Sequence, residues 1–398
     1  MELLAPAGDK SKLILAIHYG ADAVYLASKR FGLRTFAGNF DLDELKWAVE
    51  YVHSFGKKVY ITINLLPHDS DFEGLEEYII MLNNIGVDAV IVADLGVLRV
   101  VRRVAPNLAV HISTQANVLN SETANFYAEM GVSRIILARE LSIDEIVNIR
   151  KNLPKHIELE CFAHGAMCIS YSGRCLLSYF MTGRDANRGA CVQACRWNYA
   201  IREVNKTNEY PIEEDEKGTY ILNSHDMCMI KHLDKLRDAG ISSIKIEGRM
   251  KSEYYVANVV NAYRKALDYL GVNSTYDLPD EIANEVYKSS HRTYSTGFFF
   301  GEPKQNLDTS LPEADYTFVA IVLEDTKDGK ALVEMRNRFF VNTCLEKLSK
   351  TKNNDIISIH KIENEQGESV DDVKTVQQRV YVYTDKPLSK YDILRRKK

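Results

Sequence analysis

Long apolar runs, a basic surplus and secretory features are all missing from this sequence of 398 residues. No segment approaches the roughly 18 consecutive apolar residues that a membrane-spanning helix needs. The first six residues, MELLAP, hold no basic cluster and open no long apolar stretch, so we predict no secretory signal peptide. A net charge of −5 gives no general argument for a nucleic-acid partner, although a local basic patch is compatible with it. We therefore expect a cytoplasmic protein with no membrane partner.

Cysteine is scarce but concentrated in one stretch. Five of the seven cysteines lie between residues 160 and 195, and the total is odd. Because no secretory signal is predicted, a disulfide framework is not expected, and clustered thiols then indicate metal or redox chemistry. Six residues separate Cys168 from Cys175, and three separate Cys191 from Cys195. Four thiolates at these spacings suit an iron–sulfur cluster, and zinc is the alternative. Zinc is second because structural zinc favours about two to four intervening residues in both pairs, and only the Cys191–Cys195 pair has such a spacing.

The first 272 residues repeat one unit, in which a short apolar run is followed by a turn and an amphipathic helix. Continuous apolar runs such as Ala89–Val92 are typical of parallel strands covered on both faces. Eight strands are predicted, at residues 2–5, 23–27, 58–63, 89–93, 109–113, 134–138, 157–162 and 243–247. Helices are predicted near residues 10–19, 42–55, 72–85, 95–104, 121–130, 142–152, 227–239 and 253–270. Eight such units favour an α/β fold, a (β/α)8 TIM-type barrel, over a doubly wound open sheet.

Further segments complete the predicted organisation. A cysteine-rich insertion at about residues 163–240 follows the seventh strand, and a connector at 273–311 follows the last barrel helix. From residue 312 to 398 apolar and polar residues alternate, as in Thr317–Val322 and Val380–Tyr383, without a helical period. Such alternation is typical of strands with one buried face, so we predict a small C-terminal β-barrel domain.

Polar residues end nearly every strand of the predicted barrel. A (β/α)8 barrel carries its active site at these C-terminal strand ends, although helix caps and loop hydrogen bonds explain about half of such residues. The candidates for the site are Asn64, Gln115, Arg139, Glu140, His164, Glu247 and Arg249. Arginine at a concave, partly desolvated mouth suits two-pronged binding of a carboxylate or phosphate. A lone histidine there is more often a hydrogen-bonding or acid–base group than a metal ligand.

The cysteine-rich insertion interleaves arginines with aromatic residues. The arginines are Arg174, Arg184, Arg188 and Arg196, and the aromatic residues are Tyr171, Tyr179, Phe180 and Trp197. One interpretation is a surface for single-stranded RNA, on which bases stack and phosphates pair with arginine. The other is internal packing, together with attraction of arginine to a negatively charged thiolate cluster. The sequence favours neither interpretation over the other.

Several segments resemble a known family. ECFAHGAMC at residues 160–168, followed by GRCLLS at 173–178, resembles the signature of the collagenase-like peptidase family of unassigned catalytic type. Supporting segments are ELLAPAG, STQAN and SIKIEGRM, at residues 2–8, 113–117 and 243–250. The resemblance covers about residues 1–300, and the cysteine motif is its specific part. The C-terminal domain resembles the small domain that longer members carry.

The resemblance implies chemistry that the family name does not suggest. Many members are oxygen-independent hydroxylases that hold a 4Fe–4S cluster. Their branches act on the tRNA wobble uridine with prephenate, on a ribosomal RNA cytidine, or on a ubiquinone precursor. The length and the appended β domain look most like the tRNA branch. The implied partners are therefore tRNA, prephenate and, as in organisms where this branch occurs as two chains, a related partner chain.

Carried onto this sequence, the resemblance implies roles for the candidate residues. The cluster ligands that it implies are Cys168, Cys175, Cys191 and Cys195. The substrate-binding candidates, with arginine for the carboxylates of prephenate, are Arg139, Arg249, Arg188, Asn64 and Gln115. The candidates for proton transfer are His164, Glu140 and Glu247.

Two other functions stay open. A peptidase is the first, but the sequence has no His-Glu-x-x-His motif and no Gly-x-Ser-x-Gly motif. A Cys–His pair, Cys161 or Cys168 with His164, would have to supply its nucleophile and base. Cys161 and His164 have opposite parity in a predicted strand and would point to different faces. The second function is a non-catalytic RNA-binding protein in which the cluster is a structural staple.

Overall fold

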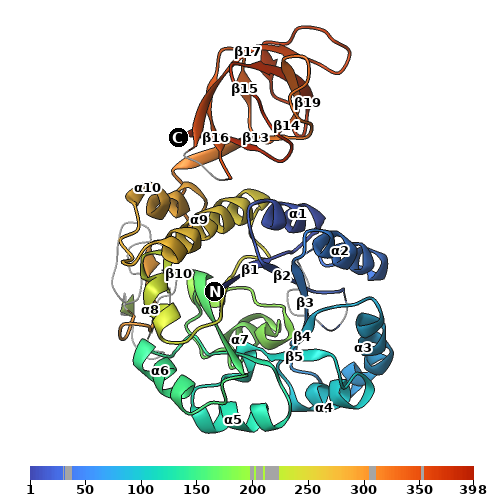
Figure 1. The fold of residues 1–398 in the computed structure, drawn as a ribbon, viewed down its shortest axis with the longest axis vertical. Coiled ribbons are helices and arrows are strands. Elements are labelled where there is room, and N and C mark those ends of the chain that lie inside the picture. The colour runs from blue at the N-terminus through green and yellow to red at the C-terminus, as the bar shows by residue number, and fades with distance from the viewer. Residues whose placement is uncertain are drawn as a thin grey trace.

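The computed structural model describes residues 1–29, 31, 38–197, 201–202, 209–210, 224–303, 311–350 and 354–398. Eight parallel strands close a barrel, and a ring of helices surrounds it (Figure 1). In barrel order the strands are β1 (Glu2–Pro6), β2 (Ala23–Leu26), β3 (Lys58–Ile63), β4 (Ala89–Val92), β5 (Ala109–Ile112), β6 (Arg134–Ile136), β7 (Glu158–Ala166) and β11 (Ser243–Ile246). The barrel closes at β11, where Ile244 lies opposite Cys161 of β7 on one side and Leu3 of β1 on the other. The predicted TIM-type barrel is confirmed.

Among the described residues, the helices around the barrel are α1 (Lys10–His18), α2 (Leu42–Ser54), α3 (Leu75–Asn84), α4 (Leu95–Val104), α5 (Ser121–Glu129), α6 (Ile143–Lys151), α8 (Leu233–Asp238) and α9 (Glu253–Val272). Six of these eight helices begin at a capping side chain, and α3 and α8 begin without one. Asp41 and Ser142, for example, each accept a hydrogen bond from a backbone N–H in the first turn, within a complete capping box. No helix in the described part of the chain is both long and apolar enough to span a bilayer.

Strand β7 is longer than predicted. It continues past Phe162 to Ala166, because its last residues pair antiparallel with β10 (Asp226–Cys228), which also pairs with β12 (Tyr294–Ser295). The other elements of the insertion are α7 (Leu177–Thr182), the 3-10 turns η3 (Ala186–Arg188) and η4 (Ala194–Arg196), and the short strands β8 (Ile201–Arg202) and β9 (Glu209–Tyr210). Short helices elsewhere are η1 (Asp69–Phe72), η2 (Thr114–Ala116), η5 (Ile230–His232), α10 (Asp280–Ala283) and η6 (Asn284–Lys288).

The C-terminal residues form a second, antiparallel barrel, which confirms the predicted β domain. Its strands, in the order in which they pair, are β13 (Tyr316–Val322), β14 (Lys330–Met335), β19 (Arg379–Thr384), β17 (Asp355–Glu363), β16 (Cys344–Leu348) and β20 (Ile393–Lys397). A two-stranded ribbon of β15 (Phe339–Phe340) and β18 (Asp372–Val373) lies beside it. Alternate residues of these strands fill a core of their own, separate from that of the large barrel.

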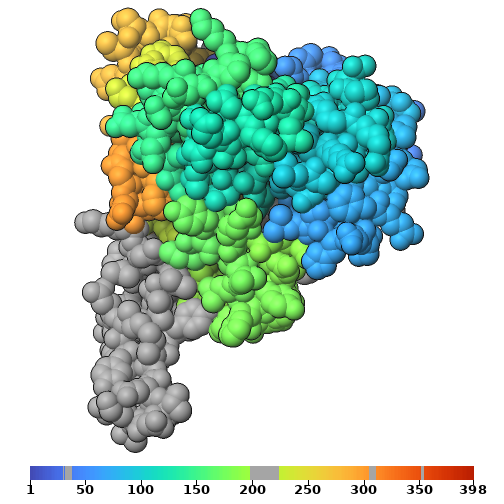
Figure 2. Space-filling view, turned by 90° about the horizontal axis from the view of Figure 1, so that it is seen from below, coloured from blue at the N-terminus to red at the C-terminus, as the bar shows by residue number. Residues whose placement is uncertain are grey.

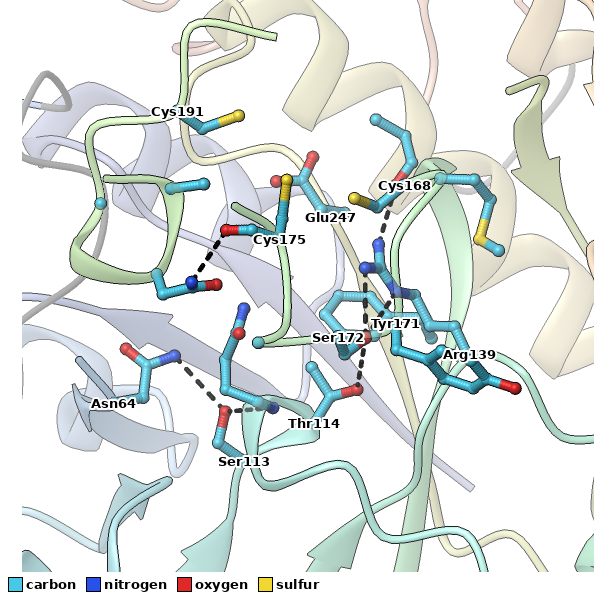
Figure 3. Close-up of a pocket in the computed structure, with 18 of the residues that line it drawn as sticks. Asn64, Ser113, Thr114, Arg139, Cys168, Tyr171, Ser172, Cys175, Cys191 and Glu247 are labelled. Atoms are coloured by element: carbon cyan, nitrogen blue, oxygen red, sulfur yellow. Dashed lines mark hydrogen bonds between the residues drawn. The ribbon is translucent and has the colours of Figure 1, made fainter. Parts of the chain in front are cut away.

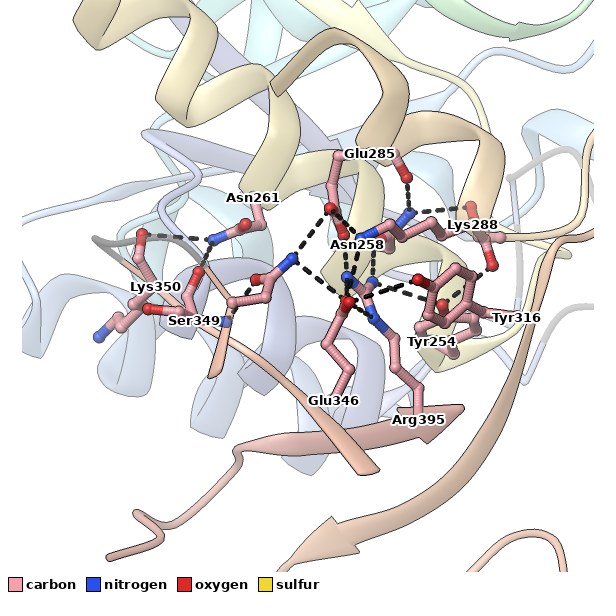
Figure 4. Close-up of polar contacts among 12 residues, drawn as sticks. Tyr254, Asn258, Asn261, Glu285, Lys288, Tyr316, Glu346, Ser349, Lys350 and Arg395 are labelled. Atoms are coloured by element: carbon pink, nitrogen blue, oxygen red, sulfur yellow. Dashed lines mark hydrogen bonds and ion pairs between the residues drawn. The ribbon is translucent and has the colours of Figure 1, made fainter. Parts of the chain in front are cut away.

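A buried arginine joins the two barrels (Figure 4). Arg395 of β20 is fully buried, and its Nη1 donates to Asn258 Oδ1 of α9 at 2.6 Å. Its guanidinium also pairs with the carboxylates of Glu285 and Glu346. Lys288 Nζ lies 3.1 Å from Glu285 Oε2 and 3.0 Å from Glu346 Oε1. Arg395 and Lys288 therefore each pair with both carboxylates at this junction.

Candidate active site at the mouth of the barrel

A pocket of about 190 Å³ opens at the C-terminal ends of the barrel strands, beneath the cysteine-rich loop (Figure 3). Strand ends contribute one wall, and residues from Ala166 to Arg196 contribute the other. Nine of the residues predicted for the site line it, namely Asn64, Gln115, Arg139, Glu247, Arg249, Cys168, Cys175, Cys191 and Cys195. Three others, Glu140, His164 and Arg188, are not among the lining residues.

The four cysteines of the loop are partly buried and belong to this one pocket. In Figure 3 the sulfur atoms of Cys168, Cys175 and Cys191 face the same space as the carboxylate of Glu247. Burial, together with the three neighbouring thiols, raises the pKa of Cys195 to about 11. Ionised as thiolates, the four cysteines would repel one another. A bound metal centre with positive charge would offset that repulsion.

The backbone of the loop is shaped to hold these thiols over the mouth. Gly173 has a φ of +73°, and a Cβ there would stand 2.4 Å from the carbonyl oxygen of Gln115, so the loop lies directly on the strand ends. Gln193 is also left-handed, with φ 57°, and its backbone N–H donates to Cys191 Sγ at 3.4 Å. N–H groups directed at cysteine sulfur are among the interactions that tune iron–sulfur clusters.

The four thiols provide the ligand set that a four-iron cluster requires. In a four-iron cluster each thiolate binds a different iron, which suits four thiols spread around one pocket.

Two arginines reach the pocket from the ends of β6 and β11, the two strands that flank β7, and each is held in place by the protein. Arg139 follows β6 and donates from Nε and Nη2 to Ser172 Oγ, at 3.3 and 3.2 Å. Its Nη1 donates to the carbonyl oxygen of Ala166 at 3.2 Å. Arg249 follows β11, is 4% exposed, and donates from Nη1 to Thr62 Oγ1 at 3.4 Å. Fixed guanidinium groups of this kind are suited to binding a carboxylate.

A lysine that is absent from the predicted site forms the floor of the pocket. Lys245 Nζ lies 3.4 Å from Glu160 Oε1 and 4.2 Å from the ring centroid of Tyr25. Glu160, fully buried, also pairs with Arg134, which reaches Glu2 at 2.6 Å near the opposite end of the barrel. Burial lowers the pKa of Lys245, and the Glu160 carboxylate opposes that shift. The sequence does carry a signal for this residue. Lys245 lies between two isoleucines of a buried strand, and because side chains alternate between the two faces of a strand, the lysine points into the barrel.

His164 lies away from the pocket because of a bulge in β7. The register between β7 and β11 shifts after Phe162, so that Ile246 lies opposite His164 rather than Ala163. The ring packs among tyrosines, with Tyr294 Oη 3.3 Å from Nε2 and the Tyr263 ring centroid 5.3 Å away. Burial lowers the pKa of His164 to about 3. The imidazole is therefore neutral and enclosed by aromatic rings, and His164 is not among the residues that line the pocket.

Glu140 and Arg188 also face other surroundings. Glu140 is partly buried, and its Oε2 finds no hydrogen-bond partner among the described residues. Arg188 donates to both oxygens of Asp71, at 2.7 and 3.0 Å, and to the carbonyl oxygen of Leu66 at 3.0 Å. It therefore fastens the cysteine-rich loop to the segment that follows β3.

The cysteine–histidine pair of a peptidase is not assembled. Cys161 and His164 are 3% and 1% exposed, and burial raises the pKa of the Cys161 thiol. A nucleophile needs an accessible, ionisable thiol next to a base. Cys168 lines the pocket, whereas His164 is not among its lining residues, and no hydrogen bond joins the two in the described part of the chain.

Comparison with known proteins agrees with the resemblance of the cysteine motif. The tRNA hydroxylation protein P1 of Bacillus subtilis (strain 168) is 38% identical over 402 residues, which cover 100% of this chain and 95% of that protein. The tRNA hydroxylation protein P of Escherichia coli (strain K12) is 34% identical over 413 residues, covering 93% and 90%. The 23S rRNA 5-hydroxycytidine C2501 synthase of the same organism is 40% identical over 268 residues, covering 67% of this chain and 39% of that protein.

Both parts of the chain match one family. Residues 8–309 match the family described as Peptidase family U32, and residues 314–395 match the Peptidase family U32 C-terminal domain. The two matches correspond to the cysteine-containing barrel and to the small β barrel described above. The chain therefore belongs to peptidase family U32.

Proposed function

We propose that this protein hydroxylates RNA, and that its product is 5-hydroxyuridine at the wobble position of tRNA, formed without molecular oxygen and with prephenate as co-substrate. The observation that carries the proposal is one pocket lined by four cysteines, two fixed arginines and a carboxylate. Relatives that align with nearly the whole chain are named tRNA hydroxylation proteins, which supports RNA as the substrate.

The cluster ligands in this proposal are Cys168, Cys175, Cys191 and Cys195. When bound, a 4Fe–4S cluster supplies redox or Lewis-acid chemistry next to the reacting base. Four cysteines line the pocket together, and the Gln193 N–H adds a donor to one sulfur. Arg188 supports this set indirectly, because it fastens η3 to the segment after β3 through Asp71.

The arginines would bind the co-substrate. Prephenate carries two carboxylates, and Arg139 and Arg249 present two guanidinium groups to the same pocket. Their hydrogen bonds to Ser172, Ala166 and Thr62 hold both groups in position before binding, which lowers the entropy lost on binding. Lys245 adds a third cationic side chain at the floor, where its ammonium group pairs with Glu160.

Proton transfer falls to Glu247 in this arrangement. Among the described residues that line the pocket, Glu247 is the one with a carboxylate side chain. In Figure 3 this carboxylate faces the space between Cys168 and Cys175. A carboxylate in that position can accept a proton from the substrate base and return it later. The loop above the mouth limits access of water to the same space.

Nucleoside mass spectrometry tests the proposal directly. tRNA from a strain that lacks this protein is expected to lose a hydroxylated uridine, and the gene for the wild-type protein is expected to restore it. The variant with all four pocket cysteines changed to alanine should not restore it. Cys344→Ala is the matched control, because that thiol is exposed on the C-terminal barrel. Restoration by the four-cysteine variant would overturn the proposed role of the cluster.

Purification under anaerobic conditions, followed by reconstitution with iron and sulfide, gives a second readout. The wild-type protein should bind about four irons and four sulfides per chain, and the four-cysteine variant should bind neither. If the strain that lacks this protein loses hydroxycytidine from ribosomal RNA, and not hydroxyuridine from tRNA, the substrate is 23S ribosomal RNA, as the name of the 23S rRNA synthase relative states for that protein. No change in either RNA would leave the hydroxylase proposal without support.

A further inference from the structure

The cysteine-rich loop exposes an unusual amount of apolar surface beside the pocket. Six of the 19 exposed large hydrophobic residues in the described part of the chain lie between residues 171 and 197. Phe180 is 89% exposed, Leu176 69%, and Tyr171 and Tyr179 55% each. In Figure 2 this segment, coloured light green, forms a lobe on the surface of the barrel. Contiguous exposed apolar patches of this kind usually mark a binding surface.

Helix α7 shows that this exposure is built in. A surface helix normally buries its apolar residues and exposes its polar ones, but α7 does the opposite. Ser178 is 1% exposed, and its hydroxyl donates to the carbonyl oxygen of Arg184 at 2.7 Å and accepts from the backbone N–H of Val192 at 3.1 Å. The aromatic residues Tyr179 and Phe180 point outward instead. The helix is thus fixed to the loop by its polar residue and presents rigid aromatic rings to its surroundings.

The arginines of the loop divide into two kinds. Arg188 is engaged with Asp71, and Arg196 donates to the carbonyl oxygens of Ser224 and Met167, at 3.1 and 3.0 Å. Arg174 and Arg184 are exposed, and they lie in the same segment of the chain, residues 171–197, as the exposed aromatic residues. The segment 171–197 holds four arginines and one acidic residue, Asp185, in a chain whose net charge is −5. A local positive surface therefore borders the aromatic one.

The aromatic surface is continuous with the pocket. Tyr171 is exposed and also lines the pocket, and Cys175 lies between it and α7 in the sequence. Asn187 Nδ2 donates to the carbonyl oxygen of Cys175 at 2.9 Å, which ties η3 to the segment just before α7. A molecule seated on this surface would lie next to whatever enters the pocket.

We propose that the exposed side chains of Tyr171, Leu176, Tyr179, Phe180 and Met181 form a docking surface for unpaired nucleotides that flank the nucleotide in the pocket. This inference rests on the proposed RNA substrate. Bases stack on Phe180 and Tyr179, and the phosphates between them lie within reach of Arg174 and Arg184. Stacking on rigid rings is tolerant of base identity, so this surface holds the loop of the RNA while the pocket selects the base.

Changes at Phe180 separate stacking from general apolar contact. Because the side chain is almost fully exposed, its replacement should leave the fold intact. The probe is a fluorescently labelled anticodon stem-loop RNA, titrated with the reconstituted full-length protein. Phe180→Ala should weaken binding about tenfold, within the roughly five- to 150-fold range for loss of one base–aromatic stack. Phe180→Leu should weaken it similarly, whereas Phe180→Trp should bind like the wild type.

Two controls accompany these variants. Phe55 is 55% exposed and lies at the C-terminal end of α2, before β3 and therefore at the barrel end away from the pocket, so Phe55→Ala should not change binding. The same RNA with its loop paired to a complementary strand offers no unpaired bases, and its binding should not respond to Phe180→Ala. Unchanged RNA affinity in Phe180→Ala, or full affinity in Phe180→Leu, would overturn the inference. So would a change in oligomeric state without a change in RNA affinity, which would identify a contact between protein chains.

The binding assay and the hydroxylation assay fail independently. If the wild-type protein forms no hydroxylated nucleoside, the proposed function fails, while the affinities of the Phe180 variants still decide the docking surface. If the wild-type protein hydroxylates RNA and Phe180→Ala does so with unchanged KM, the docking surface is refuted and the proposed function stands. The expected result is a KM raised about tenfold with little change in kcat, because Phe180 lies outside the pocket.

Discussion

The junction between the two barrels gives a sharp test of the electrostatic reasoning. Arg395→Met removes a fully buried guanidinium while keeping most of the length and apolar volume of the side chain. In the wild type, Arg395 and Lys288 both pair with Glu285 and Glu346 (Figure 4), and Lys265 interacts with the same two carboxylates. The variant removes the one fully buried cation of this group, whose partner Glu285 is 3% exposed.

The expected loss follows from the burial of these charges. Removing one partner of a buried ion pair costs about 3–5 kcal/mol, because the remaining charge stays desolvated and uncompensated. Arg395 also loses its 2.6 Å hydrogen bond to Asn258 of α9, so the loss should fall on the attachment of the C-terminal barrel. The double variant Arg395→Met, Glu285→Gln also removes the buried carboxylate that has lost the guanidinium. It should therefore be less destabilised than Arg395→Met alone.

Guanidinium unfolding followed by far-UV circular dichroism measures the loss, with solution scattering to detect separation of the barrels. Arg338→Met is the matched control, because Arg338 makes a two-pronged pair with Asp372 at 2.9 and 2.8 Å on the surface of the same domain. Solvent screens that pair, so little change is expected. The reasoning is refuted if Arg395→Met and Arg338→Met unfold at the same denaturant concentration, or if Glu285→Gln worsens rather than relieves Arg395→Met.

Three further predictions concern the pocket and its loop. Lys245→Met should raise KM for prephenate about tenfold or more with a smaller change in kcat, as expected for loss of a charge-assisted contact, and an unchanged KM would remove Lys245 from the substrate site. Gly8→Ala should lower the thermal midpoint, because its Cβ would stand 2.2 Å from the carbonyl oxygen of Arg249; an unaltered midpoint would contradict this packing. The hydrogen bonds from Arg188 lower the pKa of Asp71 to about 2, so their stabilisation is present above about pH 4 and is lost as the pH falls towards 2. Thermal unfolding of Asp71→Asn should depend less steeply on pH across that window, and identical slopes would count against the pair.

Much of this site follows from the sequence because parallel strands bring their C-terminal ends together. Apolar runs separated by helices specify the barrel, and that fold alone gathers Asn64, Gln115, Arg139, Glu247 and Arg249 at one mouth. The four clustered cysteines follow the seventh strand, so their loop has to emerge at the same end. The C-terminal barrel follows from period-two alternation.

What the sequence leaves undecided depends on contacts between distant segments. A bulge against β11 turns His164 towards the tyrosines of α9, and no local pattern announces it. Arg188 is engaged by Asp71, 117 positions away in the chain. Lys245 becomes part of the site only when the barrel closes around Glu160.

The four arginines and the aromatic residues of the loop show the same division. Their spacing by itself is compatible with packing or with RNA binding. The tertiary structure buries Ser178, engages Arg188 and Arg196 in internal hydrogen bonds, and leaves Phe180 exposed. The sequence therefore determined which chemical groups are present and at which end of the barrel they stand. Only the folded chain decided which of them face the pocket, which hold the loop, and which remain on the surface, because partners far apart in the sequence compete for each side chain.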